Sequence, residues 1–202
     1  MKRMAALVFP GFQTLDFFGP IELLAGFRDE IELVTVAKST DPIVSRHGQR
    51  LCVDAALSDG TDFDVLLVPG GDSALTEAID EETLGWIRNV SARAEVVLAV
   101  CTGTIVLGMS GVLDGKRATT NKLDFNATIG LAPAVDWVKS ARWVEDGKYF
   151  TSSGVSAGMD AALAVAAKMF GQDKAREMAD GSEYIWNSDP ADDPFAYQVD
   201  GD

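Results

Sequence analysis

The residue best suited to chemistry is Cys101, in the segment AVCTG at residues 99–103. An apolar run precedes it and helical spacing follows it, so we expect a buried strand to turn into a helix at this residue. A side chain in such an elbow projects above the sheet, where it can act as a nucleophile. Because the N-terminus of the next helix favours negative charge, we predict a lowered pKa for the thiol. The alternative is a buried structural cysteine, which is common, but the junction favours the nucleophile.

Backbone N–H groups near this cysteine could stabilise a developing negative charge. Pro69-Gly70-Gly71 ends the neighbouring predicted strand, and ligands of such sheets bind beyond the carboxyl ends of the strands. The N–H groups of Gly70, Gly71 and Thr102 are therefore expected to form an oxyanion hole. The other interpretation of Pro-Gly-Gly is a plain turn between a strand and a helix.

Asp16 is the candidate acid and base, because it interrupts an otherwise apolar stretch, TLDFFG at residues 14–19. A carboxylate in such a stretch is costly to bury without a partner. It could stand beside Cys101 as proton donor and acceptor, or it could cap the first helix, and the sequence favours neither.

Other reactive side chains carry weaker signals. His47 is the single histidine, and its position at a predicted turn indicates solvent exposure, so a Cys–His dyad is not favoured. Cys52 lies in an apolar excursion and is expected in the core, whereas Asp192 and Asp193 are expected to be solvated. Neither a dinucleotide nor a phosphate-binding glycine motif occurs, and the two cysteines lack zinc-site spacing. We expect no metal and no organic cofactor.

The elements that must position these residues alternate between strand and helix. Continuous apolar runs predict buried strands at residues 4–9, 31–37, 64–68 and 95–100. Helical spacing predicts helices at 14–27, 73–93 with a break near Asp80, 102–110, 156–170 and 173–186. Less regular segments predict a hairpin-like excursion at 43–53, a short strand at 117–120, and a hairpin of 142–144 with 149–152. This order indicates an α/β fold with a mostly parallel sheet and helices on both faces.

The composition limits which classes of partner and location the protein can have. A net charge of −14 over 202 residues disfavours nucleic acid and anionic membranes as partners. No apolar stretch is long enough for a membrane span, and Pro10-Gly11 ends the first apolar run too early for a signal peptide. We expect one cytoplasmic domain covering residues 1–202, with a loosely ordered acidic tail at 187–202.

Several segments, in this order, resemble the ThiJ/PfpI superfamily. They are VFPG (8–11), DFFGPIE (16–22), VPGG (68–71), VCTG (100–103), GVLDGKRATT (111–120) and SGVSAGMD (153–160). The resemblance implies a flavodoxin-like three-layer sandwich with a nucleophile-elbow cysteine. It also implies a homodimer that acts on a small electrophilic substrate.

Within that superfamily, Thr102 after the cysteine and aspartate at position 16 resemble the isonitrile hydratase branch, which converts an isocyanide to an N-substituted formamide. The resemblance gives catalytic roles to Cys101, Asp16 and Thr102, and oxyanion or substrate contacts to Gly70, Gly71, Thr102 and Gly154. One departure is Thr120-Asn121-Lys122, where many relatives have Thr-His-Trp. The missing histidine argues against a Cys–His amidase.

Two other functions remain open. One is a glyoxalase or deglycase acting on methylglyoxal through a thiohemiacetal at Cys101, which aspartate at position 16 makes less favoured than glutamate would. The other is a non-enzymatic sensor of oxidative stress, in which Cys101 is oxidised to the sulfinate. A ligand-sensing domain of a transcription regulator is not favoured, because the chain is strongly acidic.

Overall fold

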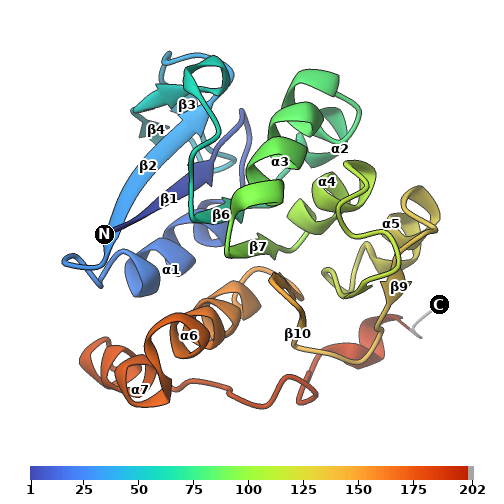
Figure 1. The fold of residues 1–202 in the computed structure, drawn as a ribbon. Coiled ribbons are helices and arrows are strands. Elements are labelled where there is room, and N and C mark those ends of the chain that lie inside the picture. Colours follow the sequence, from blue (N-terminus) through green and yellow to red (C-terminus); the bar gives the residue numbers. More distant parts are fainter. Residues whose placement is uncertain (200–202) are drawn as a thin grey trace.

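The centre of the molecule is a seven-stranded sheet, seen in a computed structural model that describes residues 1–199 (Figure 1). Its strand order is β10-β11-β7-β6-β1-β2-β5, and only the β10–β11 pair is antiparallel. The strands are β1 (Lys2–Leu7), β2 (Ile31–Ala37), β5 (Ala55–Ala56), β6 (Val65–Val68), β7 (Val96–Val100), β10 (Trp143–Asp146) and β11 (Tyr149–Ser152). The predicted mostly parallel sheet and the 142–152 hairpin are confirmed.

Helices cover both faces of the sheet, which confirms the predicted three layers (Figure 1). One face carries α1 (Thr14–Leu24), α6 (Ala157–Phe170) and α7 (Gln172–Gly181); the other carries α2 (Ala74–Glu77), α3 (Glu81–Arg93) and α4 (Gly103–Met109). The smaller elements are β3 (Ile43–Val44) paired with β4 (Arg50–Leu51), β8 (Arg117–Ala118) paired with β9 (Asp136–Trp137), α5 (Phe125–Leu131), and the short 3-10 helices Leu57–Asp59 and Ala196–Val199. Among the described residues no helix is long and apolar enough to cross a membrane.

The register of three adjacent strands creates the site. Every residue of β6 and β7 is buried, because helices cover the sheet on both sides, and this explains their unbroken apolar sequences. Val68 of β6 lies beside Ala99, and Val100 of β7 lies beside Ser152 of β11. The segments that follow these three strands therefore emerge together at one edge of the sheet.

The predicted boundaries hold for most elements and fail at the periphery. The break near Asp80 is confirmed, since Asp80 caps α3 by accepting a hydrogen bond from the Thr83 N–H at 2.9 Å. The closing helix stops at Gly181 rather than continuing to residue 186. Cys52 is exposed, so its predicted core position is wrong: it follows β4, which pairs only with β3 outside the main sheet.

The expected loose tail is also wrong for residues 187–199; residues 200–202 lie outside the described part of the chain. Pro190 accepts a hydrogen bond from the Arg142 N–H at 2.8 Å. Asp193, expected to be solvated, has a buried side chain and forms an ion pair with Lys122 at 3.3 Å. The ion pair with buried Lys122 keeps Asp193, and with it this part of the tail, against the domain. Sequence spacing could not predict this pair.

This ion pair leads to a stability prediction. Changing Lys122 to methionine should lower the free energy of unfolding by about 3–5 kcal/mol, because Asp193 then stays buried without its counter-charge. Urea unfolding followed by circular dichroism measures the difference. The matched control is Lys2→Met, which breaks the exposed pair with Glu95 and should cost less than about 1 kcal/mol. Equal losses in both variants would contradict a stabilising role for the buried pair.

Candidate functional site

Cys101 occupies a strained elbow between β7 and α4. Its φ angle is +57°, a region that residues with a Cβ rarely adopt. The tight turn also depends on Gly103, since a Cβ there would lie 2.4 Å from the Val68 carbonyl oxygen. The Thr120 hydroxyl donates a hydrogen bond to the Cys101 carbonyl at 2.9 Å and fixes the turn from the other side. The predicted strand-to-helix elbow at Cys101 is confirmed, and the role of its sulfur as a nucleophile stays a prediction.

Asp16 lies beneath this elbow, fully buried in the first turns of α1. Its Oδ2 accepts a hydrogen bond from the Gly70 N–H at 3.0 Å, whereas no described residue forms a hydrogen bond with Oδ1 in good geometry. Burial raises the pKa of Asp16 to about 7, although the Gly70 N–H and the Cys101 thiol both oppose that shift. The N-cap of α1 is Gln13, so Asp16 is not a helix cap. The helix-cap interpretation is therefore wrong, and the acid–base role stays a prediction.

The thiol of Cys101 differs from its prediction. Burial raises its pKa far above the usual value, and the charge of Asp16 raises it further. The Thr102 N–H and hydroxyl lower it, but less strongly. The predicted low pKa is therefore wrong, because a seven-residue helix cannot offset burial beside a carboxyl group. At neutral pH the sulfur holds its proton, and Asp16 is the adjacent group able to accept it.

The expected oxyanion donors are also arranged differently. The Gly70 N–H is bound to Asp16, and the Gly71 N–H donates to Thr102 Oγ1 at 3.0 Å. The expectation that both glycine N–H groups face the cysteine freely is wrong in this state, because side chains already occupy them. The Thr102 N–H does face the sulfur. Gly154 borders the same cavity as Cys101.

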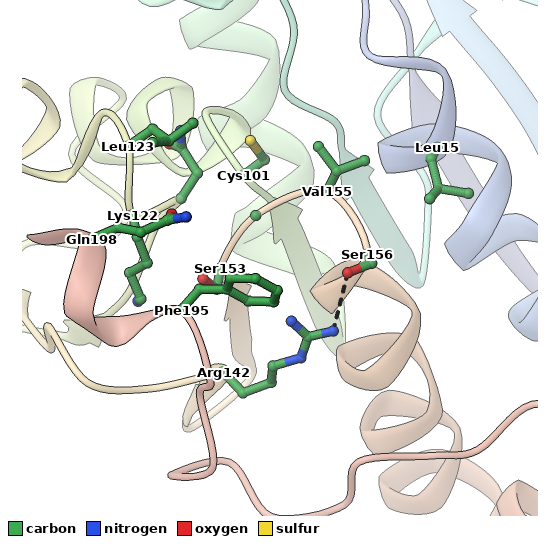
Figure 2. Close-up of a pocket in the computed structure, with 12 residues that line it drawn as sticks. Leu15, Cys101, Lys122, Leu123, Arg142, Ser153, Val155, Ser156, Phe195 and Gln198 are labelled. Carbon is green, nitrogen blue, oxygen red and sulfur yellow. Dashed lines mark hydrogen bonds between the residues drawn. The ribbon is translucent and has the colours of Figure 1, made fainter.

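Two cavities meet at Cys101, of about 270 Å³ and about 380 Å³. Figure 2 shows the smaller one, which Leu15, Leu123, Val155 and Phe195 line with apolar surface. Its polar lining comes from Asn121, Lys122, Arg142, Ser153, Ser156 and Gln198. The second cavity is bordered by α5 and by Gln13, Arg46 and Asp72.

Sequence reasoning missed most of this lining. Arg142 precedes an ordinary hairpin, and Phe195 and Gln198 come from the tail, so no local pattern pointed to them. Asn121 did carry a signal, since it replaces a family histidine; its amide donates to Asp124 Oδ2 at 2.6 Å. His47 is exposed, as predicted, and its Nδ1 lies 2.8 Å from Thr14 Oγ1, outside both cavities. Within residues 1–199 no cluster of three His, Cys, Asp or Glu side chains could hold a metal.

The buried carboxyl leads to a pH prediction for stability. The pKa of Asp16 is raised from 3.8 to about 7, so folding takes up a proton between these values. Its stabilising contribution is full below about pH 4 and is lost as the pH rises through about 7, by up to about 4 kcal/mol. Asp16→Asn lacks this loss, so its stability relative to wild type should increase from pH 4 to pH 8. Urea unfolding at a series of pH values measures this difference, and a constant difference would contradict the raised pKa.

Comparisons with known proteins agree with this fold. A model of the DJ-1/PfpI family matches residues 2–168. Isonitrile hydratase of Pseudomonas putida is 39% identical over 176 residues, which span 86% of this chain and 75% of that protein. The crystal structure of a ThiJ/PfpI family protein from Pseudomonas syringae superposes with a TM-score of 0.82 at 34% identity, covering 94% of this chain and 76% of that one. A deglycase of Thermococcus kodakarensis is 25% identical over 144 residues, 70% of this chain and 84% of its own.

Proposed function

The chain belongs to the DJ-1/PfpI family, and within it we propose that the protein hydrates an isocyanide to an N-substituted formamide. The observation that carries this proposal is the pair formed by the elbow thiol of Cys101 and the buried carboxyl of Asp16, whose pKa is about 7. No histidine lines either cavity at Cys101 in the described residues. The likeness to the Pseudomonas putida hydratase supports the same reaction.

Addition to the isocyanide needs one proton and one nucleophile at the same carbon. The Cys101 thiol gives its proton to the Asp16 carboxylate while the sulfur bonds to the terminal carbon. Asp16 then delivers that proton to the carbon, which leaves a thioimidate, R–N=CH–S–. A carboxyl group with a pKa of about 7 suits both transfers near neutral pH.

Hydrolysis of the thioimidate reverses these roles. Water gives a proton to Asp16 as its oxygen bonds to the carbon, and Asp16 passes this proton to the nitrogen, which leaves Asp16 as a carboxylate again. The tetrahedral adduct then collapses: its hydroxyl proton returns to the sulfur by way of Asp16, and the carbon–sulfur bond breaks. The products are R–NH–CHO and the original thiol. Thr102, whose N–H and hydroxyl face the sulfur, stabilises the negative charge that develops there.

The decisive experiment is formation of a formamide from para-nitrophenyl isocyanide by the wild-type protein, followed by chromatography against a synthetic standard. We expect continuous turnover without added metal or cofactor. Failure to form the formamide from this and from an alkyl isocyanide would overturn the proposal and leave the family assignment intact.

The likeness to a deglycase makes glyoxalase or deglycase chemistry on methylglyoxal the second candidate. Lactate rather than a formamide would then be the product. The sensor hypothesis is weaker, because peroxide reacts with thiolates and the pKa of Cys101 is raised. The homodimer and the cytoplasmic location stay predictions.

A further inference from the structure

Two cationic side chains border the smaller cavity, and one of them has no capacity left for a ligand. The Nζ of Lys122 is surrounded by acceptors. These are Thr119 Oγ1 at 2.8 Å, the Ala141 carbonyl at 3.0 Å, Asp193 Oδ2 at 3.3 Å and the Thr120 carbonyl at 3.4 Å. The three protons of the ammonium group are thus used inside the protein.

Arg142 differs. It is only 8% exposed, its Nε donates to Asp160 Oδ2 at 2.9 Å, and its Nη2 donates to Ser156 Oγ at 3.2 Å. Its other terminal nitrogen, Nη1, has no acceptor among the residues that the structure describes. Figure 2 shows this nitrogen directed into the cavity, between Phe195 and Ser156. This nitrogen is absent from the described side-chain atoms that are fully buried without a partner, so it is accessible from the cavity, where a bound ligand could supply its acceptor.

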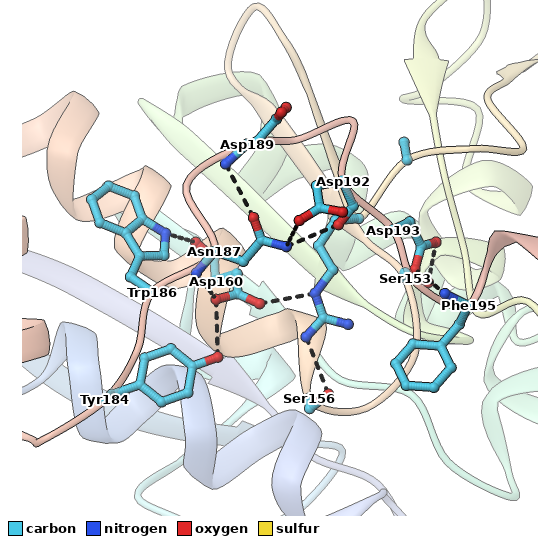
Figure 3. Close-up of polar contacts among 12 residues, drawn as sticks. Ser153, Ser156, Asp160, Tyr184, Trp186, Asn187, Asp189, Asp192, Asp193 and Phe195 are labelled. Atoms are coloured by element: carbon cyan, nitrogen blue, oxygen red, sulfur yellow. Dashed lines mark hydrogen bonds and ion pairs between the residues drawn. The ribbon is translucent and has the colours of Figure 1, made fainter.

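Asp160, the partner of Arg142, positions the guanidinium but accepts from it only the hydrogen bond of Nε, so Nη1 is left without an acceptor in the described residues. Asp160 also accepts hydrogen bonds from the Tyr184 hydroxyl and the Asn187 N–H through Oδ1, both at 2.9 Å (Figure 3). Its negative charge is therefore shared among three donors. Burial lowers the pKa of Lys122, and the charge of Arg142 lowers it further, so the two cations lie close enough to repel each other.

From this geometry we propose that Arg142 binds a carboxylate of the substrate, so that the substrate class is isocyanides that carry a carboxylate. This rests on the proposed hydration at Cys101, which borders the same cavity of about 270 Å³. The isocyanide end would meet Cys101, and the carbon body would contact Leu15, Val155 and Phe195. Arg142 suits a carboxylate because charge-assisted hydrogen bonds from guanidinium are stronger than those to neutral acceptors.

The test compares para-isocyanobenzoate with its methyl ester, which has nearly the same shape but no charge. For wild type we expect kcat/KM to favour the acid by about tenfold or more. Arg142→Lys keeps a positive charge beside Asp160 but removes Nη1, and should bring the two values within about threefold by lowering that of the acid. Arg88→Lys is the matched control: it makes the same change at the exposed pair with Glu81, borders neither cavity, and should retain the preference for the acid. Equal kcat/KM values in wild type, or an unchanged preference in Arg142→Lys, would overturn the assignment.

A binding measurement separates this proposal from the proposed reaction. Calorimetry with Cys101→Ala uses the corresponding products, para-formamidobenzoate and its methyl ester, and needs no turnover. Tighter binding of the acid by about tenfold, lost on adding Arg142→Lys, supports the carboxylate site even if no isocyanide is hydrated. Equal binding of acid and ester overturns the carboxylate site even if hydration proceeds.

Discussion

Replacing Cys101 with alanine is expected to lower formamide production from para-nitrophenyl isocyanide at least about a thousandfold, because the thioimidate can no longer form. The fold should remain, since the thiol contributes one small buried group and alanine carries the same Cβ in the strained turn. Initial rates over a wide range of enzyme concentrations measure the loss. Unfolding in urea confirms that the variant is folded.

The matched control is the second free cysteine of the chain. Cys52 is exposed and borders neither cavity at Cys101, so Cys52→Ala should keep wild-type turnover. Equal inactivation of both variants would point to general damage. Substantial turnover by Cys101→Ala would show that water attacks the isocyanide directly and that the covalent route is wrong.

Replacing Asp16 with asparagine is expected to lower turnover by about a hundredfold to ten thousandfold, the usual range for a lost general acid or base. Asparagine has nearly the same size, and its side-chain oxygen can still accept the Gly70 N–H, so positioning is retained while proton transfer is lost. In steady-state kinetics, the fold decrease in kcat should be larger than the fold increase in KM. Wild-type turnover by this variant would exclude Asp16 as the acid and base.

The pH profile gives this prediction a second readout. The reactive state holds one proton between Cys101 and Asp16, and it gains a second proton when the pH falls below the pKa of Asp16, about 7. Wild-type kcat/KM should therefore rise with pH through about 7 and then level off. Asp16→Asn should lack this step in its residual activity. The control is Asp64→Asn. The Asp64 carboxylate also accepts a hydrogen bond from a backbone N–H, that of Arg3 at 2.8 Å, and Asp64 borders neither cavity. This variant should keep the wild-type profile.

The sequence was sufficient to predict the sheet, the elbow, and Cys101 and Asp16 as the candidate reactive side chains. Buried parallel strands need apolar residues on both faces, so β6 and β7 can be recognised in the sequence as continuous apolar runs. The order of strands and helices restricts the connections, because the ends of adjacent parallel strands meet at one edge. Cys101 and Gly70 could thus be placed together, and Asp16 could be singled out as a carboxyl in an apolar stretch.

The tertiary structure decided the state of those residues and the identity of their partners. The Gly70 N–H is 54 residues from Asp16, its acceptor. The Ser153 hydroxyl donates to Asp193 Oδ2, 40 residues away, at 3.3 Å. No local pattern could pair residues so far apart. Burial is likewise a property of the packed molecule, and it reversed the expected shift in the pKa of Cys101. Long-range packing likewise places residues 187–199 against the domain and leaves Arg142 Nη1 without an acceptor among the described residues. Residue types and local spacing are set by sequence, whereas desolvation and long-range partners depend on how distant segments pack.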